Sequence, residues 1–323
     1  MSSARLSQQT IVFGIFIVLF LVFSLLLPGF FSASNIVALL QNVAILGILG
    51  LGMAIVVIGR GIDISMIAAL AVPPGLVLQM VNDGYPVSVS VAAALALVIV
   101  FGLVNGWLIA YAEVPSLFTT LASGLFLAGL GQVAFFKLDL VPWPPQLDAI
   151  AGFGRGSIVG IPMPVVMFGL TILVCAFLLR YTRFGTYLYA TGDNPLGART
   201  IGIPTRPLIL RQYVFAALIA AFAGMVMAAS IGTMQTRIYN STMIYDVILV
   251  VVLGGIGLSG GRGGVLNAVT GTLLIGTLLN GMTILDMSYS AQNLIKGVIL
   301  LIAILIDSVL NPRNEETAQQ GDI

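Results

Sequence analysis

The stretch ALLQNVAILGILGLGMAIVVIG, residues 38–59, contains no charged side chain over its whole length. A helix that crosses the hydrocarbon core of a bilayer needs about 20 mostly apolar residues, so this stretch predicts one membrane-spanning helix. The rest of the chain has the same character, because 59% of its 323 residues are hydrophobic and only 8% are charged. Soluble globular domains carry roughly 25% charged residues. We therefore expect an integral membrane protein.

Apolar stretches of this kind recur along the chain. The candidate spans are residues 10–29, 38–59, 64–82, 86–111, 117–136, 162–180, 211–231, 244–258, 264–286 and 291–310. Pro73 and Pro74 interrupt the third span and the eighth is short, so we expect some of the helices to be broken. These features predict an all-α, polytopic membrane protein with about ten transmembrane helices.

Basic residues are distributed unevenly between the two sides that ten spans define. With a cytoplasmic N-terminus, most of the 13 basic residues lie inside, namely Arg5, Arg60, Arg180, Arg183, Arg199, Arg206, Arg211, Arg262 and Arg313. Membrane proteins keep an excess of Lys and Arg in their cytoplasmic segments. We therefore expect both termini to be cytoplasmic, with residues 311–323 forming a short cytoplasmic tail.

Two segments between spans are long. Residues 137–161 are expected outside, and Pro142, Pro144 and Pro145 make a helix there unfavourable. Residues 181–210 are expected inside and are the most polar part of the sequence between the first and last spans. A polar, basic and glycine-containing segment is poorly explained by packing within the membrane, although a simple solvated connector would have the same composition.

Two Asn-Gly pairs suggest an internal repeat. Asn105-Gly106 lies in the fourth span and Asn280-Gly281 in the ninth, and these spans cross the membrane in opposite directions. Transporters are often built from inverted repeats, and here spans 2–5 would correspond to spans 7–10. A single shared dipeptide also arises by chance.

Several kinds of chemistry are excluded by composition. The chain has no histidine and one cysteine, Cys175, so a thiolate or imidazole metal site and a serine-histidine hydrolase are not expected. Neither Lys137 nor Lys296 follows a glycine, so no Gly-x-x-x-x-Gly-Lys phosphate loop is present. We expect no catalytic residue, no metal site and no cofactor on this chain. The net charge of +1 gives no indication of nucleic-acid binding.

Polar residues within or beside the spans are candidates for a solute pathway or gate. They are Asn42, Arg60, Asp63, Asn105, Thr119, Thr120 and Asn280, with Gln132 as a further possibility. Each neutral residue among them could equally form a hydrogen bond between helices, and Arg60 and Asp63 would share a face if their segment were helical. No acidic residue lies at the centre of a span. This absence disfavours a carrier that binds a proton or Na⁺ in mid-membrane.

Four separated blocks resemble a known family. They are GIDIS at residues 61–65, TRFGTYLYATGDNPLGARTIGI at 182–203, Asp246, and VVLGGIGLSGGRGGVLNAVTGTLLIGTLLNG at 251–281. In this order they resemble the permease subunits of ribose-type sugar ABC importers of bacteria, over about residues 28–310. Ile201 and Ile244 replace a serine and a glutamate that the family often carries.

The resemblance implies a function and a set of partners. Residues 1–310 would form one permease domain, paired with a second identical or related permease in the bacterial inner membrane. A cytoplasmic ATPase would hold ATP and Mg²⁺, and a periplasmic or lipid-anchored binding protein would deliver the sugar. The loop at 181–210 would couple to the ATPase. Its matched positions are Gly192, Asp193, Asn194, Gly197, Ala198, Arg199, Gly202 and Ile203.

Two other readings remain open from the residues alone. An ion-coupled secondary transporter of a small polar solute would need an ion gradient and no ATP, and a channel would conduct without a binding protein. Both are compatible with a polytopic, weakly charged chain.

Overall fold

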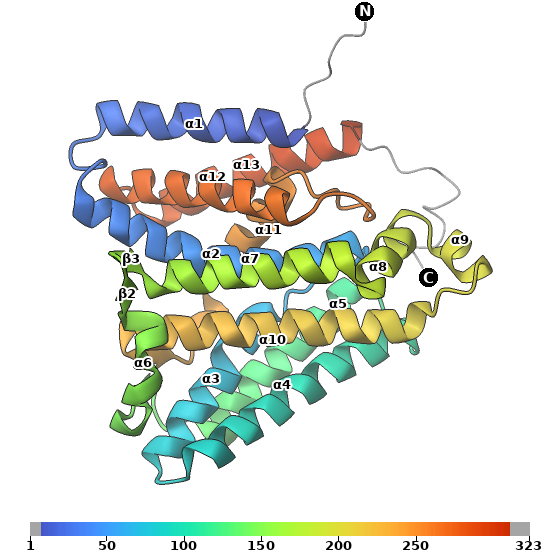
Figure 1. Cartoon of the computed structure of the whole chain (residues 1–323), viewed down its shortest axis with the longest axis horizontal. Helices are drawn as coiled ribbons and strands as arrows, with labels where there is room; N and C mark the ends of the chain where they lie inside the picture. The colour runs from blue at the N-terminus through green and yellow to red at the C-terminus, as the bar shows by residue number, and fades with distance from the viewer. Residues whose placement is uncertain (1–7, 311–323) are drawn as a thin grey trace, which may run out of the picture.

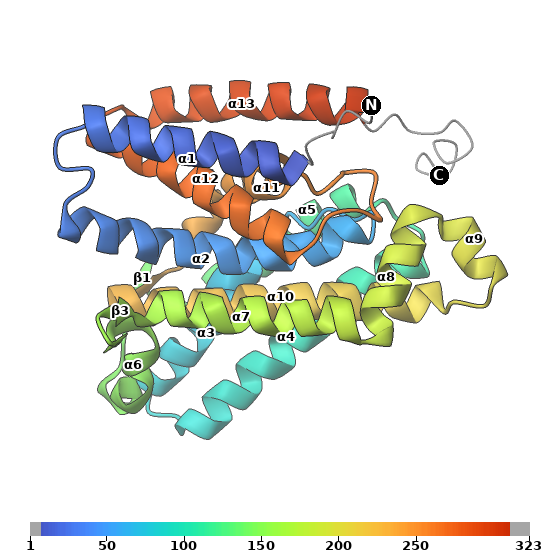
Figure 2. The ribbon, with the colours of Figure 1, turned by 45° about the horizontal axis from the view of Figure 1, so that its top comes forward.

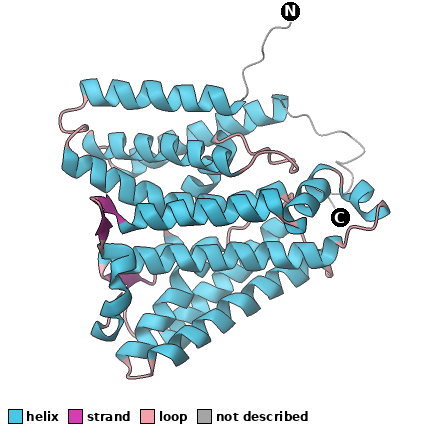
Figure 3. Cartoon of the chain, viewed as in Figure 1, coloured by secondary structure: helices cyan, strands magenta, loops and turns pink. Residues whose placement is uncertain are grey.

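The computed structural model describes residues 8–310 of the chain, so Arg5, Arg313 and the predicted tail at 311–323 lie outside the described residues. One helix stands at each of the ten predicted spans. They are α1 (Gln8–Leu26), α2 (Ala33–Ile58), α3 (Met66–Asn82), α4 (Val87–Ala110), α5 (Ser116–Leu130), α7 (Met163–Tyr181), α10 (Thr205–Ile231), α11 (Met243–Leu253), α12 (Val265–Ile284) and α13 (Tyr289–Leu310). The π-helical turn η1 (Gly131–Phe135) extends α5. The prediction of an all-α polytopic protein is confirmed, and helices dominate the molecule in Figure 3.

Eight of these helices are long and apolar enough to cross a membrane. The two exceptions within residues 8–310 are α3 and α11, with 17 and 11 residues, at the third and eighth spans, which the sequence marks as the weakest. Pro73 and Pro74 lie inside α3 without ending it. By contrast α11 ends where Gly254 and Gly255 begin a glycine-rich loop, because glycine is a poor helix former.

The segment at 137–161 corrects one prediction. It contains β1 (Leu140–Pro142), the 3₁₀ turn η2 (Pro145–Leu147), the helix α6 (Asp148–Arg155), β2 (Ser157–Ile158) and β3 (Ile161–Pro162). The expectation of no helix was wrong because the prolines all precede α6, where they restrict only the approach to the helix. β1 pairs antiparallel with β4 (Thr233–Gln235), with Val141 opposite Met234, and β2 pairs with β3.

The polar segment at 181–210 is also more ordered than a loop. It forms α8 (Arg183–Asp193) and α9 (Pro195–Thr200), and α10 already begins at Thr205 rather than at the predicted 211. The Asn194 side chain accepts a hydrogen bond from the Gly197 amide at 2.8 Å, which caps α9.

These extra elements define two opposite ends of the helix bundle. In Figures 1 and 2, α8 and α9 lie at one end, and α6, β2 and β3 lie at the other. The first turn of α1 and the last turn of α13 both lie at the α8–α9 end. An even number of membrane crossings produces this arrangement.

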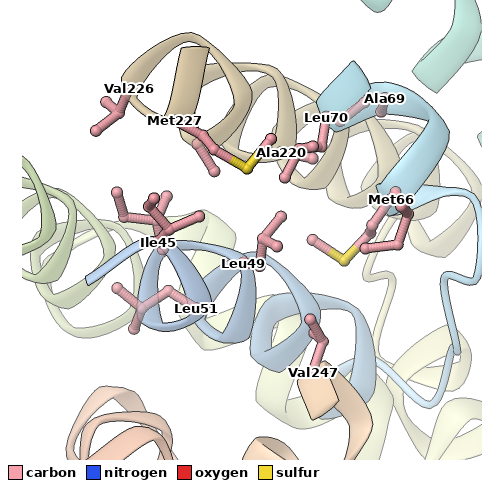
Figure 4. Packing of buried hydrophobic residues seen from close by; sticks show 14 of the residues in the cluster. Ile45, Leu49, Leu51, Met66, Ala69, Leu70, Ala220, Val226, Met227 and Val247 are labelled. Atoms are coloured by element: carbon pink, nitrogen blue, oxygen red, sulfur yellow. The ribbon is translucent and has the colours of Figure 1, made fainter. Parts of the chain in front are cut away.

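The core is centred on α2. Every residue of α2 from 43 to 58 is buried, and a helix that is apolar all round is stable only when other elements surround it. Figure 4 shows Leu49 of α2 close to Leu70 of α3 and Ala220 of α10, with Val247 of α11 on the other side. The long helix α10 packs on α2, α3 and α4.

Helix contacts follow the predicted internal repeat. α4, the third helix of the first half, packs on α10, the first helix of the second half, and α12 packs on α2 in the same way. Within the halves, α3 contacts α4 and α5, while α11 contacts α12 and α13. The short helices α3 and α11 are each the second helix of their half. The proposed correspondence of spans 2–5 with spans 7–10 therefore also describes which helices pack together.

Candidate functional site

Three segments that the sequence singles out meet at the α8–α9 end of the molecule. They are the linker 59–65 between α2 and α3, the end of α8 at 189–193, and residues 260–263 of the loop between α11 and α12. We call this meeting point the glycine junction. It brings together parts of the chain that are about 130 and 70 residues apart in sequence.

Backbone contacts hold the glycine junction together. The Gly261 amide donates a hydrogen bond to the Ile58 carbonyl at 2.8 Å. Gly192 lies against that same carbonyl and against the Gly261 backbone, so closely that a Cβ atom at position 192 would overlap both. The Tyr189 hydroxyl donates to the Gly263 carbonyl at 2.9 Å. The last turn of α8 is therefore attached to both of the other segments.

Unusual backbone angles accompany these contacts. Gly260, Gly261 and Gly263 have φ of 83°, 70° and 93°, and Arg60 has φ of 66°. Glycine adopts positive φ without steric cost, but an arginine there is strained. The linker is not helical at Arg60 and Asp63, so these two residues do not share a helix face. The Arg60 side chain instead runs beside Gly260.

Asp63 is the centre of a buried hydrogen-bond network. Its carboxylate accepts from the amide of Ser65 at 2.9 Å and from the Ser65 hydroxyl. The Asn105 side chain on α4 donates to the Ser65 hydroxyl oxygen at 3.0 Å. Asp63 and Asn105 are 2% and 1% exposed, so water cannot replace these partners. The network fixes the linker to α4.

The start of α5 holds the other side of the linker. The Ile64 amide donates to the Thr120 hydroxyl oxygen at 3.1 Å, and the Ile62 amide donates to the Ser116 hydroxyl oxygen at 3.2 Å. The predicted pathway residues Arg60, Asp63, Asn105 and Thr120 therefore belong to one assembly around the linker. Thr119 is buried one residue away from Thr120.

Two predicted pathway residues lie apart from this assembly. Asn280 is near the end of α12 and exchanges two hydrogen bonds of 2.9 Å with Asn35 at the start of α2. Asn42 is exposed on α2, and Gln132 donates to the Thr236 hydroxyl oxygen at 2.8 Å. Asn280 and Gln132 thus form hydrogen bonds to neighbouring segments. Such packing contacts are the alternative that the sequence left open to a role in the pathway.

Sequence reasoning missed two residues of the site, Gln212 and Tyr213. The Gln212 side chain donates to the Val56 carbonyl at 2.9 Å, and Gly59 and Gly61 lie against Gln212 and Tyr213 respectively. Both side chains are buried. A polar pair that directly follows Arg211 at the start of an apolar run was the available signal.

The remaining coupling residues lie in α9 and in the turn after it. Ala198 is buried, Arg199 donates through Nε to the Thr205 hydroxyl oxygen at 3.3 Å, and the Ile203 amide closes the turn on the Ala198 carbonyl. Gly202 has φ of 84°, as that turn requires. Leu196 and Ile201 are 49% and 76% exposed, so this polar end presents apolar side chains outward.

Two ion pairs lie at the opposite end of the molecule. The Lys137 ammonium donates to Asp83 at 2.7 Å, and this hydrogen bond lowers the pKa of the Asp83 carboxyl below its usual value. Arg237 pairs with Asp139 at 2.7 Å. Among the described side chains of residues 9–306, no three Cys, Asp or Glu are grouped so that they could hold a metal ion.

The Asp246 block places one more ion pair in the bundle. Asp246 in the first turn of α11 lies 2.9 Å from Lys296 of α13, and the two side chains are only 13% and 6% exposed. Lys296 also donates to the Thr242 hydroxyl oxygen at 3.2 Å. Ile244, where the resembled family often has a glutamate, is buried.

Comparison with known proteins extends these observations. Residues 35–304 match the family described as branched-chain amino acid transport system / permease component. The ribose import permease of Escherichia coli K12 is 32% identical over 90% of this chain and 91% of its own length. That of Bacillus subtilis 168 is 35% identical over 91% and 90%. The xylose transport system permease of Haemophilus influenzae is 29% identical over 87% and 90%.

No solved structure gives a significant match. The family match covers both glycine-rich loops, α8, α9 and nine of the ten apolar helices, all except α1. The chain therefore belongs to this permease family, as a membrane-spanning permease component of a transport system.

Proposed function

We propose that this chain is the pathway-forming subunit of an ATP-driven importer of a sugar. The family description names branched-chain amino acids, but the relatives that match about 90% of the chain are ribose import permeases. A pentose, a hexose or a related polyol is the expected class.

The glycine junction is the observation that carries the proposal. A force applied to α9 reaches α8 through one residue, Asn194, and α8 is bonded to the loop 260–263 and packed on the end of α2. The linker that follows α2 is fixed by Asp63, Ser65 and Thr120 to α3, α4 and α5. A movement of the exposed end is therefore passed directly to several membrane helices.

Leu196 and Ile201 supply the docking surface in this proposal. Both apolar side chains are exposed at the charged end of the molecule and are therefore available for a protein contact. The partner is a cytoplasmic ATPase that carries the ATP and Mg²⁺. A second permease chain completes the pathway, and a periplasmic or lipid-anchored binding protein delivers the sugar to the opposite end, near α6.

The orientation follows from charge. Seven basic residues lie in or beside α8, α9 and the adjoining helix ends and loops, namely Arg60, Arg180, Arg183, Arg199, Arg206, Arg211 and Arg262. The positive-inside rule places this end in the cytoplasm, together with both termini, in the inner membrane of a bacterium.

The test is purification of the tagged full chain from its native membrane in mild detergent, with mass spectrometry of what copurifies. We expect an ATPase with Gly-x-x-x-x-Gly-Lys phosphate loops, and sugar uptake by the reconstituted complex that needs ATP and survives an ionophore. A chain that purifies alone and drives uptake that an ionophore abolishes would instead establish an ion-coupled transporter.

A further inference from the structure

A groove on the outside of the bundle runs between α4 and α10. It has a volume of about 320 Å³ and its wall includes Ile99, Leu103 and Tyr111 on one side and Leu210, Arg211 and Val214 on the other. All of the lining side chains are apolar or aromatic except Arg211. The groove therefore has a long apolar part and a single charged group.

The two helices form this groove because they touch along a line behind it. Gly102 and Gly106 of α4 lie against the backbone of Val214 and Leu210 of α10, with no room for a Cβ atom. Such small-residue contacts let membrane helices approach closely. Larger side chains on either side of the contact then form the walls of a furrow, and Figure 1 shows the two helices converging toward the α9 end.

The length of the groove matches one leaflet of a bilayer. Ile99 and Tyr111 are 12 residues apart, which is about 18 Å along a helix, and half of the hydrocarbon core is about 15 Å. α10 has 27 residues and is about 40 Å long, so it extends beyond the core. The predicted seventh span begins at residue 211, so we place Arg211, in the second turn of α10, at the level of the headgroups.

Arg211 is available to a ligand. Its side chain is exposed, and among the side chains that the structure describes, those of residues 9–306, it has no ion-pair or hydrogen-bond partner. The neighbouring Arg206 differs, since it pairs with Glu113 at 3.3 Å and lies over the Tyr111 ring at 5.3 Å. One positive charge at the polar end of an apolar, leaflet-deep groove is complementary to one anionic phospholipid.

We propose that the α4–α10 groove binds an anionic phospholipid, with an acyl chain along Leu103 and Val214 and the phosphate on Arg211. A guanidinium can donate two parallel hydrogen bonds to a phosphate. A zwitterionic headgroup carries its own ammonium, which competes with Arg211 for that phosphate. The site therefore selects phosphatidylglycerol over phosphatidylcholine with the same acyl chains. It does not depend on the transported solute or on the ATPase.

The experiment is native mass spectrometry of the purified full chain with equal amounts of these two lipids. The unmodified chain retains phosphatidylglycerol in preference to phosphatidylcholine. One basic residue near a charged headgroup contributes enough to change affinity about fivefold, so Arg211→Gln lowers phosphatidylglycerol retention by about that factor. The matched variant Arg183→Gln, which removes an exposed arginine of α8 that does not line the groove, leaves retention unchanged. Leu103→Trp fills the groove and lowers the retention of both lipids.

Three results would overturn the proposal. The first is equal retention of the two lipids by the unmodified chain, and the second is the same retention by Arg211→Gln and the unmodified chain. The third is the formation of disulfide-linked dimers in the membrane by Val214→Cys in a Cys175→Ala chain, which would show that a second copy of this chain occupies the groove. A lipid-filled groove keeps this cysteine monomeric.

Discussion

Gly192 is the single residue on which contact between α8 and the membrane helices depends most closely. Its Cα lies against the Ile58 carbonyl at the end of α2 and against Gly261 in the loop after α11. Its backbone conformation is not a left-handed one, so glycine is needed here for space and not for φ. The consequence of adding one methyl group is therefore purely steric.

Gly192→Ala should separate α8 from the linker and reduce ATP-dependent uptake to a small fraction, while the chain still inserts into the membrane. Overpacking of this kind costs about 1–3 kcal/mol, which is enough to break the contact without unfolding the bundle. Uptake into membrane vesicles, normalised to the amount of inserted protein, measures the effect. Gly169→Ala on α7 is the matched control, because no atom of a neighbouring element lies within 4 Å of a Cβ placed there. Equal uptake by the two variants would refute the role of the junction.

Asp63→Ala should lower both thermal stability and uptake. The change leaves the buried Ser65 amide and hydroxyl without their acceptor, and an unsatisfied buried polar group costs about 1–3 kcal/mol. Asp63→Asn should lose less, because its amide oxygen still accepts from the Ser65 amide. The apparent melting temperature of the purified chain ranks the variants. An asparagine variant that melts no higher than the alanine variant would contradict this role of the Asp63 carboxylate.

The residues around the linker show what sequence could reveal at this scale. Asp63, Asn105 and Thr120 stand out because polar residues are rare in apolar runs, and the structure joins them. Their partner Ser65 and the role of Tyr189 depend on contacts over tens of residues, which no local pattern encodes. Gln132 and Asn280 stand out equally but join helices elsewhere. A polar residue in a predicted span therefore indicates that its side chain has a hydrogen-bond partner, but the sequence does not identify that partner.

At the scale of elements, α11 and α13 are joined by the Asp246–Lys296 pair. Both side chains are largely buried and lie 2.9 Å apart. Removing one partner of a buried ion pair leaves an uncompensated charge and costs about 3–5 kcal/mol, whereas replacing both with apolar residues is often neutral.

Lys296→Met should therefore strongly lower the melting temperature of the purified chain, and adding Asp246→Leu should restore much of it. The matched comparison is Lys137→Met, which removes a lysine from an exposed pair with Asp83 and should change stability little. If the double variant melts no higher than Lys296→Met, the ion pair is not what joins α11 and α13.

Element positions were largely predictable because span length is set by the bilayer. All ten spans are helices, with ends mostly within a few residues of prediction. The errors have physical reasons. α10 begins six residues early, because a helix can continue past the membrane through polar residues such as Arg206. α6 was missed because it begins only after the last proline of its segment.

At the scale of the whole molecule, the distribution of basic residues alone predicts which end of the protein faces the cytoplasm. Ser157 beside α6 and Thr200 at the end of α9 are exposed at opposite ends. Thr205, at the start of α10, is less suitable for cysteine labelling from the inner side than Thr200, because it is only 6% exposed.

In a Cys175→Ala chain, Ser157→Cys should react with a membrane-impermeant maleimide in intact cells, and Thr200→Cys should react only after the membrane is opened. Cys175 is buried, so its replacement should not disturb labelling elsewhere. The opposite pattern would reverse the orientation and move α9 away from any cytoplasmic ATPase.

The most direct test of the central claim is photo-crosslinking from α9 in the native membrane. A photoreactive residue replaces the exposed Leu196 in one chain and the 96% exposed Val159, at the opposite end, in another. We predict that position 196 captures an ATPase with a phosphate-binding loop and that position 159 does not. Capture of no ATPase from position 196, or equal capture from both positions, would contradict the assignment of α8 and α9 as the coupling element.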